Sequence, residues 1–96
     1  MPGFTIPADH PSLPGHFPGQ PVVPGVVLLA EILACIATAH PGSRIDGFQQ
    51  IKFLSLVLPG QQVEVALQPP SEGRLGFSAS VAGRPVLRGS LALHPA

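Results

Sequence analysis

The sequence has few charged residues, and their two signs balance. Charged side chains make up 10% of the 96 residues, with five basic residues against five acidic ones. There is no run of basic residues and no alternation of basic with aromatic residues, so a nucleic-acid surface is not supported. Since 45% of the chain is hydrophobic, few polar groups remain to cover a monomer. The composition therefore favours an interface with another chain as well as a core.

The chain also has only one cysteine, Cys35, which lies in an apolar stretch. It has no partner for an intrachain disulfide, so we expect a small buried hydrophobe in a reducing, cytoplasmic compartment. No spacing among this cysteine, the four histidines and the acids resembles a metal site. The sequence therefore predicts no metal and no resident cofactor, and it contains no serine-nucleophile or phosphate-cradling loop motif.

The chain shows no sign of a targeting or membrane-spanning segment. Residues 1–16 have neither a basic region nor a continuous apolar one, so we expect no signal peptide. The longest apolar stretch, residues 22–39, is interrupted by Pro24, Gly25 and Glu31, which favours a buried helix over a membrane span. At this length we expect a single domain, residues 1–96, that buries about 60 to 65% of its unfolded surface and gains from oligomerisation.

One helix is predicted from Gly25 to about His40. Prolines crowd residues 1–24 and keep them extended or turned, except for one short edge strand in "GFTIP". The following residues are apolar almost all round the helix, with Pro-Gly at the start and "HPG" at the end. A small protein covers such a helix by wrapping a sheet around it. Its polar members, Glu31 and Thr38, are seven residues apart and share one face.

After Gly42 the hydrophobic period becomes two. "VEVALQ", "LGFSASV" and "PVLRGSLAL" predict three half-buried strands, with turns at "PPSEG" and "AGRP". "QQIKFLSLVLPGQQ" is interpreted as a strand that is apolar on both faces, covered by the helix on one side and by a partner chain on the other. Together these elements predict an α+β domain in which an antiparallel sheet curls around one long central helix.

Two blocks of this sequence resemble one enzyme family. "GHFPGQPVVPGVVLL" before a helix, followed by "IKFLSLVLPGQQV" before a strand, is similar to the 3-hydroxyacyl-[acyl carrier protein] dehydratases of the hot-dog fold. The blocks occur in the family's order and span nearly the whole chain. The chain most resembles the compact members linked to polyene-pigment and other specialised fatty-acyl pathways. The resemblance implies a lyase of fatty-acid biosynthesis whose substrate rides on the phosphopantetheine of acyl carrier protein.

The resemblance also assigns roles to individual residues. His16 would remove a proton from C2 of a 3-hydroxyacyl thioester, which suits an imidazole whose ordinary pKa lies near ~6.5. The backbone N–H groups of Gly25 and Val26 would hold the thioester carbonyl, because the first turn of a helix has unpaired donors and a partial positive charge. Phe17 and Ala30 would contact the substrate. The residues by themselves also allow a purely structural interpretation, in which His16 fills a proline-rich turn and Pro24-Gly25 only starts the helix.

The chain departs from the family at the general acid. In the family an aspartate or glutamate lies fourteen residues after the histidine, which here is Ala30. Glu31 is one position late, and one helical residue turns the side chain by about 100°. Glu31 therefore remains a catalytic candidate, although it is one position away from the family's acid. The simpler interpretation is a solvated residue or one at the rim of the site. In the family the histidine and the acid come from two subunits, so a homodimer would lack the acid and a heterodimer would be able to supply it.

Three functions remain open on the sequence alone. The first is a dehydratase-like protein that acts on or binds 3-hydroxyacyl thioesters and releases a trans-2-enoyl thioester. The second is a non-catalytic subunit or acyl-binding module that supports an acid-bearing partner. The third is a hot-dog thioesterase, which the "GHFPG" block disfavours. The expected partners are acyl carrier protein and a second hot-dog chain, identical or related.

Overall fold

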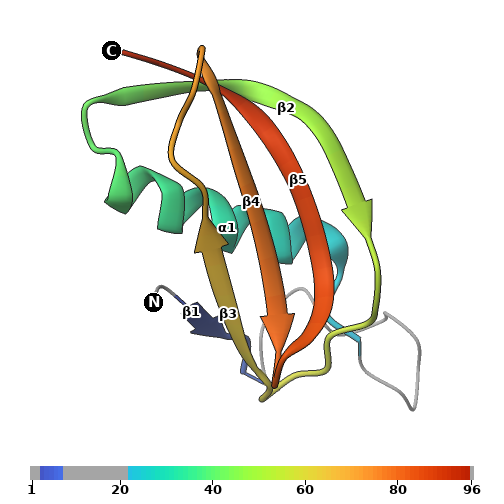
Figure 1. Ribbon diagram of the computed structural model, residues 1–96. Helices are drawn as coiled ribbons and strands as arrows, with labels where there is room; N and C mark the ends of the chain where they lie inside the picture. Colours follow the sequence, from blue (N-terminus) through green and yellow to red (C-terminus); the bar gives the residue numbers. More distant parts are fainter. Residues whose placement is uncertain (1–2, 8–21, 96) are drawn as a thin grey trace.

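The structure is a computed structural model that describes residues 3–7 and 22–95. Its elements follow the order β1 (Gly3–Thr5), α1 (Gly25–Ala39), β2 (Ser43–Phe53), β3 (Gln62–Leu67), β4 (Arg74–Val81) and β5 (Arg84–Pro95). The strands form one antiparallel sheet in the order β1-β3-β4-β5-β2. Figure 1 shows α1 lying behind this sheet, which curls around it. The predicted α+β arrangement is confirmed.

Helix α1 begins and ends where the sequence predicts. Pro24 precedes it with φ −61° and ψ 146°, an extended conformation that its ring favours. The buried face consists of Val27, Leu28, Ile32 and Ile36, at the spacing of one helical face. The N–H of His40 donates to the carbonyl of Ile36 and closes the last turn. This face packs against the sheet and forms the core.

β3 and β4 alternate between a buried and an open face, whereas β5 alternates only in part, because Val86-Leu87 and Ser90-Leu91 are buried as adjacent pairs. Leu75, Phe77, Ala79 and Val81 of β4 are buried towards the helix, whereas the residues between them are less buried. Ala82 and Gly83, both with positive φ, join β4 to β5, and the six residues between β3 and β4 turn at Glu72 and Gly73, which also have positive φ. Positive φ at both central residues belongs to the hairpin turn that matches strand twist. The turns predicted at "PPSEG" and "AGRP" are therefore confirmed.

The prediction for residues 49–62 was wrong in its extent. The strand in this region, β2, begins at Ser43 and ends at Phe53, so the leucines that follow are in a loop. After Phe53 the N–H groups of Leu54 and Ser55 both donate to the carbonyl of Val86, which ends the regular ladder. The chain then turns through Pro59 and Gly60, where φ is +86°. The doubly apolar pattern thus combined a strand with an exposed loop, not two faces of one strand.

Candidate active site

The first turn of α1 presents two unpaired backbone donors. The N–H groups of Val27 and Leu28 both donate to the carbonyl of Pro24, at 3.0 and 3.3 Å. Within residues 3–7 and 22–95, the N–H groups of Gly25 and Val26 have no backbone partner. The N-cap residue, Pro24, makes no side-chain capping hydrogen bond. The positive end of the helix dipole and two free donors therefore coincide at the Pro24-Gly25 turn.

An aromatic ring covers Gly25. A Cβ atom built at this position would lie 2.7 Å from Cζ of Phe53 and 2.9 Å from its Cε1. Only glycine allows the ring to approach this closely without a shift. Phe53 ends β2 and is 52% exposed, so its ring is held by the glycine on one side and open on the other. The ring therefore forms one wall beside the free N–H groups.

A hydrogen bond joins the two sequence blocks. The N–H of Val23 donates to the carbonyl of Val57 at 2.9 Å, and both side chains are buried. Gly60, in the second block, donates to the carbonyl of Ile6 at 2.8 Å, which ties the segment after β1 to the same place. The segment before the helix is thus fixed by residues more than thirty positions later in the chain. This contact sets where the helix begins relative to the end of β2.

Large apolar side chains surround this end of the helix without being buried. We call them the apolar edge: Val26, Phe53, Leu54, Leu56 and Leu58, which are between 42% and 75% exposed. They continue from β2, an outermost strand of the sheet, one side of which is unpaired among the described residues. Exposed apolar patches beside an open strand edge mark interaction sites.

Ala30 and Glu31 occupy different faces of α1. Ala30 is exposed and lies one turn after Val26, so both face the same side of the helix. Glu31 instead lines a cavity of about 390 Å³ with Phe4, Cys35 and Thr38. This cavity lies between α1 and β1 rather than at the free N–H groups. The side chain that follows the free donors along their own face is therefore alanine, and the carboxylate points elsewhere.

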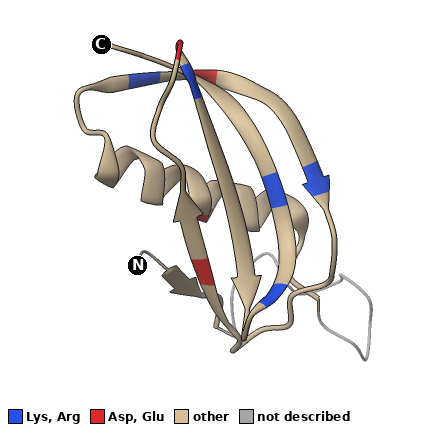
Figure 2. Cartoon of the chain, viewed as in Figure 1, with Lys and Arg blue, Asp and Glu red and all other residues tan. Residues whose placement is uncertain are grey.

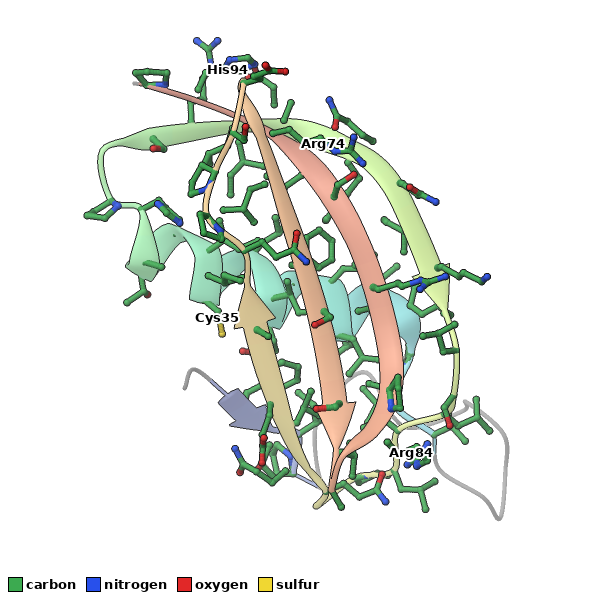
Figure 3. All side chains as sticks on the ribbon, viewed as in Figure 1. Cys35, Arg74, Arg84 and His94 are labelled. Carbon is green, nitrogen blue, oxygen red and sulfur yellow. The ribbon has the colours of Figure 1, made fainter. Side chains whose placement is uncertain are left out.

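The cavity beside β1 also contains the single thiol. Partial burial, followed by the negative charge of Glu31, raises the pKa of the Cys35 thiol above its ordinary value. Figure 3 shows Cys35 on α1, on the side of β3 and β1. A thiol held in its neutral form is a weak nucleophile. The sequence predicted a small buried hydrophobe, whereas the structure places Cys35 at intermediate burial because it lies beside the cavity rather than in the core.

The comparisons with known proteins identify the family. A family model described as ApeI dehydratase (ApeI-like) matches residues 3–90. The chain belongs to the ApeI-like dehydratase family. Among curated proteins, the chain is 34% identical to the 3-hydroxyacyl-[acyl-carrier-protein] dehydratase FabZ of Haemophilus influenzae, over 73% of the chain and 53% of the relative. FabZ of Desulforamulus reducens is 31% identical over 67% of the chain and 51% of the relative. The chain thus spans about half the length of the curated relatives it matches.

Solved structures agree on the fold. The dehydratase heterocomplex ApeI:P from Xenorhabdus doucetiae matches with a TM-score of 0.82 and 21% identity, over 96% of this chain and 83% of that one. An uncharacterised protein from Erwinia carotovora subsp. atroseptica has a TM-score of 0.82 and 28% identity, over 97% of this chain and 80% of its own. The fluoroacetyl-CoA-specific thioesterase FlK, at 18% identity and a TM-score of 0.68, shares the fold. The hot-dog fold expected from the two sequence blocks is confirmed.

The structure describes only some of the site residues that the sequence predicted. His16 and Phe17 lie outside the described residues, so their roles remain predictions. Gly25 and Val26 lie together at the free donors, with Ala30 one turn further along. Phe53 was not among the sequence candidates, although the phenylalanine of "IKF" in the second block was a signal for it. The contact between Val23 and Val57 was also missed, because only the fold brings these segments together.

The described residues hold neither a cluster of metal ligands nor a helix that spans a membrane. Among residues 3–7 and 22–95, no three histidine, cysteine or acidic side chains gather as metal ligands. In the same part of the chain, no helix is both long enough and apolar enough to cross a bilayer.

Proposed function

We propose that this chain acts on or binds 3-hydroxyacyl thioesters carried on the phosphopantetheine of acyl carrier protein. In the reaction, the C2–H bond breaks and its proton goes to His16. The C3–O bond breaks, the hydroxyl leaves as water with a proton from an acid, and a C2=C3 double bond forms. The product is a trans-2-enoyl thioester. The proposal needs no resident cofactor, and it includes the cytoplasmic location expected from the single cysteine.

The free N–H groups of Gly25 and Val26 carry this proposal. Proton loss at C2 sends negative charge to the thioester oxygen, and two backbone donors at a helix N-terminus stabilise charge at that point. The apolar edge beside them suits an acyl chain, because Phe53 and its neighbours offer open apolar surface. Membership of the ApeI-like dehydratase family supports the same chemistry.

Ala30 favours a second chain in the functional unit. An alanine cannot protonate the departing hydroxyl, and Glu31 lines a cavity on another side of the helix. The exposed apolar edge and the unpaired side of β2 support an edge-to-edge assembly. The similar ApeI:P structure is described as a heterocomplex. We therefore propose a heterodimer with an acid-bearing hot-dog chain, in preference to a homodimer.

Incubation of the purified protein with a 3-hydroxyacyl thioester, followed by mass spectrometry, tests the proposal. We expect His16→Ala to lower dehydration by about 10² to 10⁴, the usual loss for a general base. His40→Ala, at the far end of α1, is the matched control and should change nothing. Ala30→Asp should raise the activity of the isolated chain, whereas Ala34→Asp, one turn further along, should not.

The outcomes separate the alternatives. Dehydration that survives His16→Ala unchanged contradicts the proposed base. Inactivity of every variant alone, together with a tight complex with another hot-dog chain whose activity His16→Ala leaves unchanged, replaces the dehydratase with the non-catalytic subunit, which the alanine at position 30 already favours as the second candidate. Release of free acid and thiol would instead identify a thioesterase.

A further inference from the structure

A polar hollow lies on the face of the sheet that points away from α1. We call it the outer hollow; its volume is about 430 Å³. Buried Leu75 and Ala79 face the helix, so Arg74, Gly76 and Ser78, which alternate with them, face the opposite side. Figure 1 views the sheet from this side, with α1 behind it. The outer hollow is therefore separate from the free N–H groups of α1.

Short side chains form the floor of the outer hollow. Ser90 of β5 pairs with Gly76 of β4 on one side and with Gln50 of β2 on the other. Gly76 leaves room for Gln68, whose Oε1 lies 2.7 Å from the point that a Cβ at Gly76 would occupy. A glycine and a serine between longer glutamines produce a depression in an otherwise continuous sheet face.

Two arginines flank the row that contains Ser90. Arg88 lies two residues before Ser90 on β5, and Arg74 lies two residues before Gly76 on the antiparallel neighbour β4. They therefore stand on opposite sides of the row, each about 7 Å along its strand. Both line the hollow, and none of its described lining residues is acidic. Figure 3 shows Arg74 at the upper end of β4.

The described chain gives these arginines no acidic partner. Within residues 3–7 and 22–95, the ion pairs join Asp46 to Arg44 at 2.8 Å and to His94 at 3.2 Å. In Figure 2 the basic residues lie in β2, β4 and β5, whereas the acidic residues lie in α1, β3, the β3–β4 turn and the first half of β2. The charge in the outer hollow is therefore positive and available to a ligand.

The Ser90 hydroxyl is the second observation that points to a ligand. The residue is only 3% exposed and lines the hollow. Its Oγ atom has no hydrogen-bond partner within the described residues. Buried hydroxyls are almost always hydrogen-bonded, and an exception calls for a missing partner. An oxygen of a bound anion would supply that partner between the two guanidinium groups.

We propose that the outer hollow binds a small, soluble phosphate-bearing molecule. Two guanidinium groups match the double negative charge of a phosphate monoester and bind its oxygens in a forked geometry. The hydroxyls of Ser78 and Ser90 add donors, and the amides of Gln50 and Gln68 add more. A phosphate group has three terminal oxygens that can accept hydrogen bonds from these donors, whereas a carboxylate has only two oxygens. The donor set therefore favours a phosphate. The volume also leaves room for part of the ligand beyond its phosphate.

Titration with inorganic pyrophosphate at constant ionic strength, followed by NMR, tests this site. We expect saturable shifts of the backbone amide signals of Gly76, Ser78 and Ser90. Binding should weaken at least tenfold in Arg74→Gln and in Arg88→Gln, and several-fold in Ser90→Ala. Arg44→Gln, which removes the same charge outside the hollow, should bind like the unaltered protein. A dispersed spectrum of each variant shows that it is folded.

Four outcomes would overturn the proposal. The first is the absence of saturable shifts at these amides in the folded protein. The second is equal weakening by Arg44→Gln, which would mean that only overall charge matters. The third is binding of succinate as tightly as pyrophosphate, which would replace phosphate with a carboxylate. The fourth is binding to vesicles that contain phosphatidic acid without binding to pyrophosphate, which would identify a lipid surface.

Discussion

The core and the apolar edge are made of the same residue types but are buried to different extents. Ile32, Leu75 and Leu91 are completely buried, whereas Leu56 is 66% exposed and Val26 75%. Burial of the first group stabilises this chain by itself. The second group gains the same kind of free energy only if another chain or an acyl group covers it. The same residue types therefore stabilise the fold in the core and would stabilise the proposed assembly at the edge.

The largest expected effect is in the core. Leu91→Ala removes a fully buried side chain between β4 and β2, and it should lower the free energy of unfolding by about 2–5 kcal/mol. Leu56→Ala, the same change at the apolar edge, should cost the chain's own fold less than about 0.5 kcal/mol. Urea unfolding at several protein concentrations separates the two contributions. Equal losses at all concentrations would erase the distinction between the regions.

The next effect concerns association. Leu56→Asp places a charge on the apolar edge, where a partner chain would have to desolvate it. We expect the dissociation constant of the dimer, with itself or with a partner, to rise roughly tenfold or more, or about 1.4 kcal/mol. Sedimentation over a range of concentrations measures this change. Ala66→Asp, at an exposed position of the inner strand β3, is the control and should leave the constant unchanged. An unchanged constant in Leu56→Asp would exclude the apolar edge as the interface.

A smaller effect is expected where the two regions meet, at Gly25 and Phe53. Gly25→Ala forces the ring away and should cost about 1 kcal/mol, at the lower end for overpacking because the ring can swing outwards. In a Phe53→Ala background the same substitution should cost nothing. The unfolding free energies of the four variants give this coupling directly. Additive losses would show that the ring does not rest on the glycine.

The smallest expected effect is on the reactivity of Cys35, and it tests whether Glu31 lies on the same side of α1 as this thiol. Its charge is a cause of the raised pKa of the Cys35 thiol, second to burial. Glu31→Gln should therefore lower this pKa and increase the rate of alkylation at neutral pH by a few-fold at most, because the thiolate is the reactive form. Glu64→Gln, an exposed acid on β3, should leave the rate unchanged. An unaltered rate in Glu31→Gln would separate this carboxylate from the cysteine.

Local patterns in the sequence predicted most elements of the fold. Pro24 and the "HPG" segment bounded the helix, and the alternation in residues 63–93 predicted β3, β4 and β5 because side chains alternate along a strand. The start of β2 was missed, since residues 43–48 carry no clear alternation and pair with β5 through two irregular steps. Pairing with a distant strand, rather than local preference, forms that half of β2.

The candidate site was predictable only in part. The Pro-Gly start of a helix was enough to expect free N–H groups at Gly25 and Val26, because every helix begins with unpaired donors. The helical angle was enough to separate Ala30 from Glu31. Phe53 against Gly25, and Val23 against Val57, were beyond local reasoning, since each contact joins residues about thirty positions apart.

By itself, the sequence determined the helix, the turns, the family blocks and the alanine where the resemblance places the family's acid, because these depend on residue identity and short-range geometry. The tertiary structure alone decided which apolar residues are buried and which remain at the edge. It also decided that Ser90, Arg74 and Arg88 gather on one outer face. Such groupings depend on the order and register of the strands. A local hydrophobic pattern specifies neither of them, because the hydrophobic effect is not directional.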